Sequence, residues 1–252
     1  MNKIRIGWAE VDTTPEGKID LYGQYYHRVS RGIHSRLSAT ALALESGGEQ
    51  AVMVSLDLAG CSAALQEELR ARVRPELPGL DVSKLFVNAI HTHSAPTTDV
   101  IRGIEWLKEL AGILSAAEYR RFLLEKVAAA VVEAWHSRGP GGVAPAFGFA
   151  RAGHCRRAVY ANGTAEMYGR TDRNDFVGME GGEDSGVDLL FTFNTSGRPT
   201  GVIVNLACPS QVMEATYKVS SDFLGETRRL LKGHFGREFK VLGQISAAGC
   251  QS

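Results

Sequence analysis

Residues 86–96 read FVNAIHTHSAP, an apolar, β-prone run that ends in two histidines one residue apart and then meets a proline. Alternate side chains of a strand share a face, so a strand through this run would present both imidazoles on the same side. Histidine is the commonest metal ligand and moves protons near neutral pH. The stretch therefore predicts a strand of a central sheet with a candidate site at its end.

Two interpretations of His91 and His93 remain open on their spacing. In the first, one ring binds a metal and the other is its acid–base or oxyanion partner. In the second, both are polar residues at a strand end, capped by Ser94 and water. The turn Ser94-Ala95-Pro96 favours the first interpretation, because it aims the pair in a fixed direction.

Other apolar runs predict further strands, because each is closed by turn residues. These runs are residues 37–45, 51–58, 84–90, 187–194, 199–206 and 239–245. The turn Thr195-Ser196-Gly197-Arg198 joins two of them as a hairpin. Residues 37–45 could form a strand or a helix, and the following Gly47-Gly48 favours a strand in a hairpin with residues 51–58.

The helices predicted between these strands cover residues 62–73, 115–137 and 222–235. Ser62 is the expected N-cap of the first helix. Ser115 and Glu118 form a capping box at the start of the longest one, and the Gly139-Pro140-Gly141-Gly142 run stops it. Strands alternating with helices predict an α/β fold with a mixed β-sheet core and flanking helices.

The bulk composition narrows the class of protein. Lys+Arg and Asp+Glu are both 28, so a formal charge of zero argues against nucleic acid or an anionic membrane as partner. Four widely spaced cysteines argue against a zinc knuckle or a disulfide scaffold. No signal peptide and no membrane-spanning apolar stretch is visible, so we expect a cytoplasmic protein.

A length of 252 residues allows one large domain or two small ones, and we expect residues 1–252 to form a single domain. The last nine residues, 244–252, read as a strand followed at once by a turn of small residues. The predicted domain therefore looks incomplete at its C-terminal end.

Four further residues are candidates for the site. Asp57 ends a strand, where a charge is costly without a partner, and it either orients a histidine or caps the next turn. Arg156 lies in the long polar segment 151–186 and either binds a substrate oxygen or is solvated. Cys208 directly follows a strand and is either a thiolate ligand or, as we favour, a small buried residue. His34 is more typical of a core or edge histidine.

Several segments, in order along most of the chain, resemble the catalytic domain of the neutral/alkaline, non-lysosomal ceramidases. The run HTHSAP at residues 91–96 is similar to that family's His-Thr-His-Ser-(Gly/Ala)-Pro signature, which is specific. The other similar segments are residues 31–36 (RGIHSR), 54–58 (VSLDL), 155–157 (CRR), 220–223 (SSDF) and 246–249 (SAAG).

Ceramidases of this family belong to sphingolipid metabolism and cleave the amide of ceramide with one active-site zinc. The resemblance implies that His91 binds zinc, that His93 and Arg156 contact the substrate or its oxyanion, and that Asp57 supports a histidine. It implies a zinc-dependent, ceramidase-like amidohydrolase that acts on a small-molecule or lipid-like linear amide through a metal-activated water. Because no membrane-facing apolar helix is visible, we expect an amide smaller or more polar than ceramide.

The chain departs from the family's pattern in its expected zinc ligands. The family's second zinc histidine belongs after a strand, where Ala207-Cys208 is followed here by Pro209-Ser210-Gln211. Cys250 stands where the family usually has aspartate, and the family's glutamate and tyrosine ligands come from a later part of its sequence. Cys208 or Gln211 is the candidate substitute ligand beside His91.

These departures keep two alternatives open. One is a non-catalytic, ceramidase-like binding protein that retains the pocket without the metal. The other is an unrelated metallohydrolase in which His91 and His93 are joint ligands.

Overall fold

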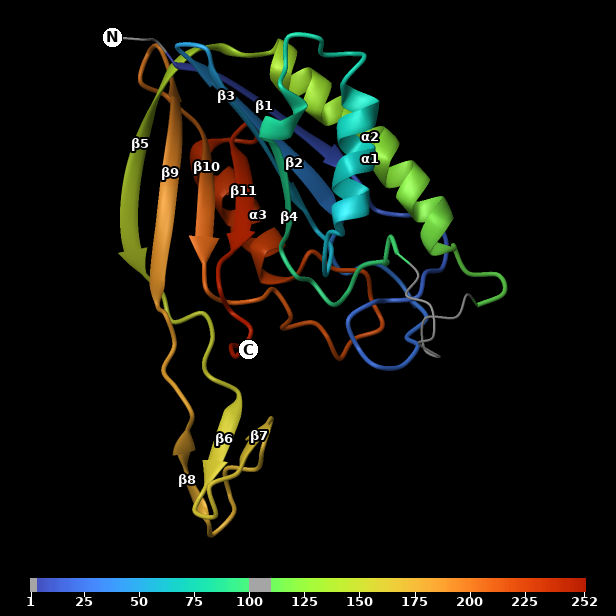
Figure 1. The fold of residues 1–252 in the computed structure, drawn as a ribbon, viewed down its shortest axis with the longest axis vertical. Helices are drawn as coiled ribbons and strands as arrows, with labels where there is room; N and C mark the ends of the chain where they lie inside the picture. Colours follow the sequence, from blue (N-terminus) through green and yellow to red (C-terminus); the bar gives the residue numbers. More distant parts are fainter. Residues whose placement is uncertain (1–3, 100–109) are drawn as a thin grey trace.

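The computed structural model describes residues 4–99 and 110–252, and its main element is an eight-stranded sheet in the order β11-β10-β9-β5-β1-β2-β3-β4 (Figure 1). The strands of this sheet are β1 (Ile4–Asp12), β2 (Ser38–Ser46), β3 (Glu49–Leu56), β4 (Leu85–Ala89), β5 (Gly139–Phe149), β9 (Gly186–Asn194), β10 (Pro199–Leu206) and β11 (Lys240–Ile245). The α-helices are α1 (Ala63–Val73), α2 (Ala116–His136) and α3 (Asp222–Phe235), with a short 3₁₀ helix, η1, at Val82–Lys84. The predicted mixed sheet with flanking helices is confirmed.

The two halves of this sheet face each other. β1 and β5 are joined by only three residue pairs. The sheet bends at this junction, so that one half lies over the other. Leu42 of β2 packs against Ile203 of β10 and Leu242 of β11, strands that are far from β2 in the sheet order. An apolar layer therefore closes the space between the halves.

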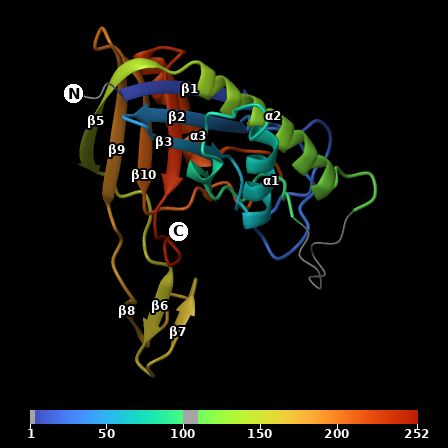
Figure 2. The ribbon, with the colours of Figure 1, turned by 45° about the horizontal axis from the view of Figure 1, so that its top comes forward.

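Helices cover the opposite faces of the two halves (Figure 2). Ala41 and Val54 point to the side on which α1 and α2 pack, and the close approach of α2 requires a glycine on β1. A Cβ on Gly7 would lie 1.9 Å from the carbonyl oxygen of Ala134. On the other half, Val202 and Val241 pack against Leu224 of α3. The period-two alternation of each strand thus produces two buried faces.

Two parallel strand pairs bring the candidate residues together. β3 runs parallel to β4, with α1 between them in sequence, and β10 runs parallel to β11, with α3 between them. The two pairs meet where Ser55 Oγ and Asn88 Nδ2 donate to the carbonyl oxygen of Gly243, over 2.7 and 2.9 Å. Because the carboxyl ends of parallel strands share an edge of the sheet, the loops after these four strands form one surface.

The predicted strands and helices are confirmed to within two residues at each end. The hairpin of β9 and β10 is antiparallel, β2 pairs with β3, and the Ser115–Glu118 capping box is present. β1 has no counterpart in the prediction. The glycine-rich run from Gly139 to Gly142 does stop α2, but it also begins β5. A Cβ on Gly141 would lie 2.4 Å from the carbonyl oxygen of Phe193, so the close pairing of β5 with β9 needs this glycine.

The polar segment 151–186 is not a loop alone. It contains a second sheet in the order β7-β6-β8, formed by Arg157–Tyr160 (β6), Ala165–Met167 (β7) and Phe176–Met179 (β8). This sheet projects from the main body below the C-terminal end of the chain (Figure 1). Its strands are three or four residues long, which explains their weak signal in the sequence.

Among the helices of the described residues, none is long and apolar enough to cross a membrane.

Candidate functional site

The two histidines meet, but not through strand alternation. β4 ends at Ala89, and His91 has a φ of 66°, so the expectation of a strand running through both residues is wrong. The left-handed backbone at His91 turns the ring back toward His93. Their Nε2 atoms lie 3.1 Å apart and their ring centroids 4.8 Å apart. The predicted pairing is therefore present with a different geometry.

Hydrogen bonding determines which nitrogen of His91 is available. Its Nδ1 lies 2.6 Å from the carbonyl oxygen of Ala59, in the turn after β3. A carbonyl oxygen only accepts, so Nδ1 carries the proton and Nε2 keeps its lone pair. The ring is exposed, so this lone pair is accessible. A backbone carbonyl that orients a metal-binding histidine is a common arrangement.

His93 is largely enclosed. Gly23 lies against its ring, and a Cβ on Gly23 would be 2.3 Å from His93 Cγ. The Nδ1 atom lies 3.0 Å from Oε2 of Glu214, although the two groups are not aligned for a hydrogen bond. Burial lowers the pKa of His93 to about 4, and the His91 ring, Arg28 and Arg156 act in the same direction. Contact with the Glu214 carboxylate opposes this shift, since a negative charge favours imidazolium.

Arg156 joins the same surface from the root of the small sheet. Its Nη1 donates to the hydroxyl of Tyr168 over 2.6 Å, and its Nη2 donates to the carbonyl oxygen of Gly249 over 2.8 Å. Gln211 Nε2 lies 3.3 Å from the same hydroxyl and 3.2 Å from Glu214 Oε2. A continuous polar chain therefore runs from His93 through Glu214, Gln211 and Tyr168 to Arg156.

Backbone strain is concentrated at this surface. In the described residues, three non-glycine residues have φ in the left-handed region: His91, Tyr168 and Asp222. Such a conformation costs about 1–3 kcal/mol and persists where neighbouring contacts impose it. Asp222 begins α3, and its carboxylate accepts from the backbone N–H groups of Val212 and Met213, over 3.1 and 2.7 Å. It thereby fixes the loop that carries Gln211 and Glu214.

Asp57 does not orient a histidine. Its buried carboxylate accepts from the backbone N–H and the hydroxyl of Ser38, over 2.8 and 3.1 Å. It also accepts two hydrogen bonds from Arg228 of α3, over 3.0 and 2.9 Å. His91 and His93 have other partners, so the expected support of a histidine by Asp57 is corrected to a buried ion pair.

The other candidates do not complete a metal site. Cys208 is buried, burial raises the pKa of its thiol, and its Sγ contacts the carbonyl oxygen of Pro209. His34 is exposed and lies 3.4 Å from Ser220 Oγ. Within residues 4–99 and 110–252, no three His, Cys, Asp or Glu side chains are grouped to hold a metal. His91 fits zinc as one ligand, but the described residues do not provide a full set.

Four residues of this surface escaped sequence reasoning: Gly23, Arg28, Tyr168 and Glu214. Glu214 follows a predicted strand, as Cys208 and Gln211 do, and that position was a usable signal. Gly23, Arg28 and Tyr168 have no comparable signal, because their roles depend on segments distant in sequence.

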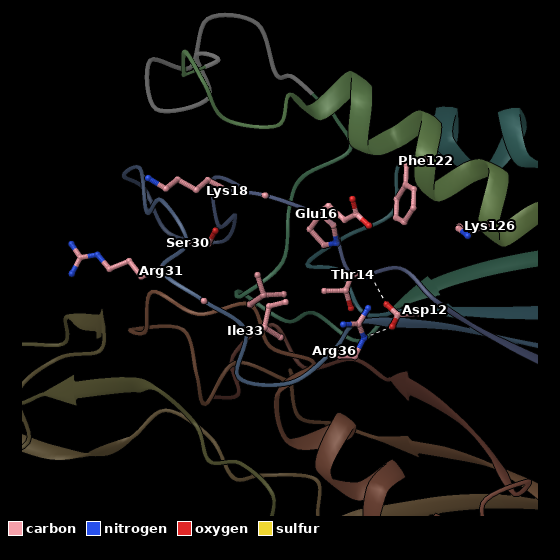
Figure 3. Close-up of a pocket in the computed structure, with 14 residues that line it drawn as sticks. Asp12, Thr14, Glu16, Lys18, Ser30, Arg31, Ile33, Arg36, Phe122 and Lys126 are labelled. Atoms are coloured by element: carbon pink, nitrogen blue, oxygen red, sulfur yellow. Dashed lines mark hydrogen bonds and ion pairs between the residues drawn. The ribbon is translucent and has the colours of Figure 1, made fainter.

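A separate cavity of about 680 Å³ lies between α2 and the loops around residues 12–18 and 30–36 (Figure 3). Its lining includes Lys18, Arg31 and Lys126 but neither His91 nor His93. Figure 3 shows that Lys18 and Arg31 extend away from Lys126, so these cations do not converge on one ligand position. The residues that could take part in catalysis are instead those around His91 and His93.

No family model and no curated protein sequence matches the chain. Among solved structures, a neutral ceramidase from Pseudomonas aeruginosa is similar over 100% of this chain, with a TM-score of 0.78 and 20% sequence identity. A ceramidase complexed with C2 gives the same TM-score and identity. The chain spans 40% and 39% of the lengths of these two proteins. The fold of this chain is therefore ceramidase-like, in a divergent sequence.

Proposed function

We propose that the chain carries part of the active site of a zinc-dependent hydrolase of linear amides, as its ceramidase-like segments imply. The observation that carries this proposal is the His91 ring, whose Nδ1–H is committed to Ala59 while its Nε2, 3.1 Å from His93 Nε2, keeps the lone pair. This is the tautomer in which a histidine binds zinc through Nε2. Zinc in such enzymes polarises the carbonyl and activates water.

Arg156 and His93 supply the polar contacts to the substrate in this proposal. Tyr168 and the Gly249 carbonyl hold the guanidinium in place. An N–H donor held in this way stabilises an oxyanion without reorganisation during the reaction. In this proposal the His93 ring, at the other end of the polar chain, exchanges a proton with the leaving nitrogen.

The substrate class we propose is a small-molecule or lipid-like N-acyl amide. Apolar side chains border the polar chain, since Val212 is 75% exposed next to Gln211 and Tyr168 is 59% exposed. Such surface beside a polar centre suits an acyl group. The two similar structures are ceramidases by their descriptions, which supports an amide as the scissile group.

Zinc binding and amide hydrolysis test the proposal. After metal extraction, zinc is titrated into wild type, His91→Ala, His93→Ala and the matched control His136→Ala, which removes an exposed histidine at the end of α2. We expect His91→Ala to bind zinc more weakly than wild type, His93→Ala and His136→Ala do. Hydrolysis of N-acyl amides of increasing acyl length follows. A wild type that binds no zinc and cleaves none of these amides would contradict the proposal.

The alternative in which both histidines are ligands has an observation of its own. Two nitrogens on tetrahedral zinc, with bonds of about 2.0–2.1 Å, lie roughly 3.3 Å apart. The Nε2 atoms of His91 and His93 are 3.1 Å apart. This alternative predicts that His93→Ala loses zinc as completely as His91→Ala does. A ceramidase-like binding protein without catalysis predicts amide binding without hydrolysis in every variant.

A further inference from the structure

A second cavity, of about 550 Å³, lies between the segment of residues 18–31 and Tyr217. The residues that line it are Lys18, His27, Val29, Ser30, Arg31 and Tyr217. No carboxylate of the described residues lines it, although three of its side chains can carry a positive charge. It adjoins the cavity of Figure 3, with which it shares Lys18, Ser30 and Arg31. A concave surface with one sign of charge concentrates ligands of the opposite sign.

Lys18 and Arg31 are the two cations that this cavity offers to a ligand. Both side chains are exposed, and neither forms an ion pair or a side-chain hydrogen bond with another described residue. By contrast, the exposed Arg170 pairs with Asp172 over 2.8 Å. Figure 3 shows Lys18 and Arg31 reaching to the same side, away from Lys126.

The backbone places these two cations opposite each other. Asp20 and Val29 form an antiparallel bridge, and the Ser30 N–H donates to the carbonyl oxygen of Ile19 over 2.8 Å. By the same register, Lys18 lies opposite Arg31. Like charges that face each other across two strands are destabilising, and within the described residues no anion offsets this pair.

Tyr217 and Ser30 complete the arrangement. The Arg31 guanidinium lies over the Tyr217 ring, 4.3 Å from its centroid, and this stacking leaves the N–H groups at its edge available. The buried Ser30 hydroxyl accepts from the Ile19 N–H over 3.0 Å. The hydroxyl's own proton has no acceptor among the described residues, so it is a third donor at the cavity.

The acidic groups near this cavity are engaged elsewhere. Asp20 Oδ2 lies 2.5 Å from His27 Nδ1, and Asp20 Oδ1 accepts from the Arg28 N–H over 2.9 Å. Figure 3 shows Glu16 lying toward α2, on the far side from the Lys18 ammonium. Because one nitrogen of His27 is occupied by Asp20, the case for an anion depends on the lysine and the arginine.

The donors favour a phosphate group over a carboxylate. An ammonium is a point charge with three N–H groups, whereas a guanidinium offers N–H groups in a planar fork. A tetrahedral phosphate has the charge and the oxygens to meet both cations and a hydroxyl, and a carboxylate has only two oxygens. Val29 and Tyr217 line the remaining space, which leaves room for an organic group.

We propose that Lys18, Ser30 and Arg31 form a binding site for a phosphate group, carried by a small phosphomonoester or by a lipid headgroup. The bound phosphate offsets the repulsion between the two cations. The site uses neither His91 nor His93, so it goes beyond the function proposed above and is tested without measuring hydrolysis.

Calorimetric titration of the chain at fixed ionic strength tests the proposal with inorganic phosphate, glycerol 3-phosphate and acetate. We expect one saturable site with a Kd below about 1 mM for glycerol 3-phosphate and at least about 10-fold weaker binding of acetate. Lys18→Gln and Arg31→Gln should each weaken binding about 10-fold, and the double variant should abolish it. The matched control is Lys126→Gln, which removes an exposed lysine of the adjoining cavity and should leave the Kd unchanged.

Cosedimentation with phosphatidylcholine vesicles, with and without phosphatidic acid, distinguishes the two sources of the phosphate. Retention only by vesicles with phosphatidic acid, lost in the Lys18→Gln, Arg31→Gln double variant, assigns the site to a lipid headgroup. Binding of glycerol 3-phosphate without vesicle retention assigns it to a soluble phosphomonoester. The proposal is overturned if neither probe binds, if the double variant binds as wild type does, or if acetate binds as tightly as phosphate.

Discussion

Breaking the buried ion pair between Asp57 and Arg228 should strongly destabilise the fold, and Asp57→Ala tests this. The Asp57 side chain is 0% exposed and that of Arg228 is 10% exposed. Removing one partner of a buried pair costs about 3–5 kcal/mol, because the other charge stays buried. The buried N–H of Ser38 also loses its acceptor, which adds about 1–3 kcal/mol. We expect a loss of about 4 kcal/mol or more in the free energy of unfolding.

Urea denaturation followed by circular dichroism measures this loss. With an m-value of about 3 kcal/mol per molar, a loss of about 4 kcal/mol lowers the midpoint by about 1.3 M. Arg229→Met is the matched control, because Arg229 lies on the same helix but pairs with Glu226 in solvent. An exposed pair contributes about 0–1 kcal/mol, so this variant should shift the midpoint little.

A double variant distinguishes the cost of an unpaired buried charge from the cost of lost side-chain packing. In Asp57→Asn with Arg228→Met, the amide oxygen still accepts from Ser38 and no cation remains buried, so most of the stability should return. The reasoning is refuted if Asp57→Ala destabilises no more than Arg229→Met. Loss of hydrolysis in Asp57→Ala at unchanged stability would restore a direct role in the site.

Two other predictions concern single positions. Gly23→Ala should cost about 1–3 kcal/mol and displace the His93 ring, because φ is +117° and the new Cβ meets that ring. Gly17→Ala, at φ +85° in open space, is its control, and equal His93 ring signals in both variants would contradict the clash. Burial raises the pKa of Cys61 to about 11, so at pH 8 its thiolate fraction, and its rate of alkylation by iodoacetamide, should be about 100-fold below the value in urea. The folded pKa of Cys61 exceeds the unfolded one, so this thiol's contribution to the free energy of unfolding is lost as pH rises from about 9 to about 11. Equal alkylation rates in the folded protein and in urea would refute the burial argument.

The site lies where two parallel strand pairs end. The turn after β3 holds the His91 ring through Ala59, and the loop after β10 supplies Gln211 and Glu214. The turn after β11 supplies the Gly249 carbonyl that holds Arg156. This surface is therefore built by loops from both halves of the folded sheet, so its shape depends on the relative position of the halves.

Interactions between residues close in sequence determined several of the helices and strands. The hairpin of β9 and β10 needs only its four-residue turn and two apolar runs, and the start of α2 needs only Ser115 and Glu118. The HTHSAP run located the histidine pair for the same reason, since its six residues are contiguous.

Tertiary structure decided the partners of those residues. Asp57 meets Arg228 across 171 positions, Arg28 meets Glu214 across 186, and neither pairing leaves a periodic trace in the sequence. A buried charge requires a partner, but the partner's identity depends on which loops the folded sheet brings together. The sequence alone therefore located the pair of His91 and His93, while the packing of distant loops determined the orientation of each ring and the groups that hold it.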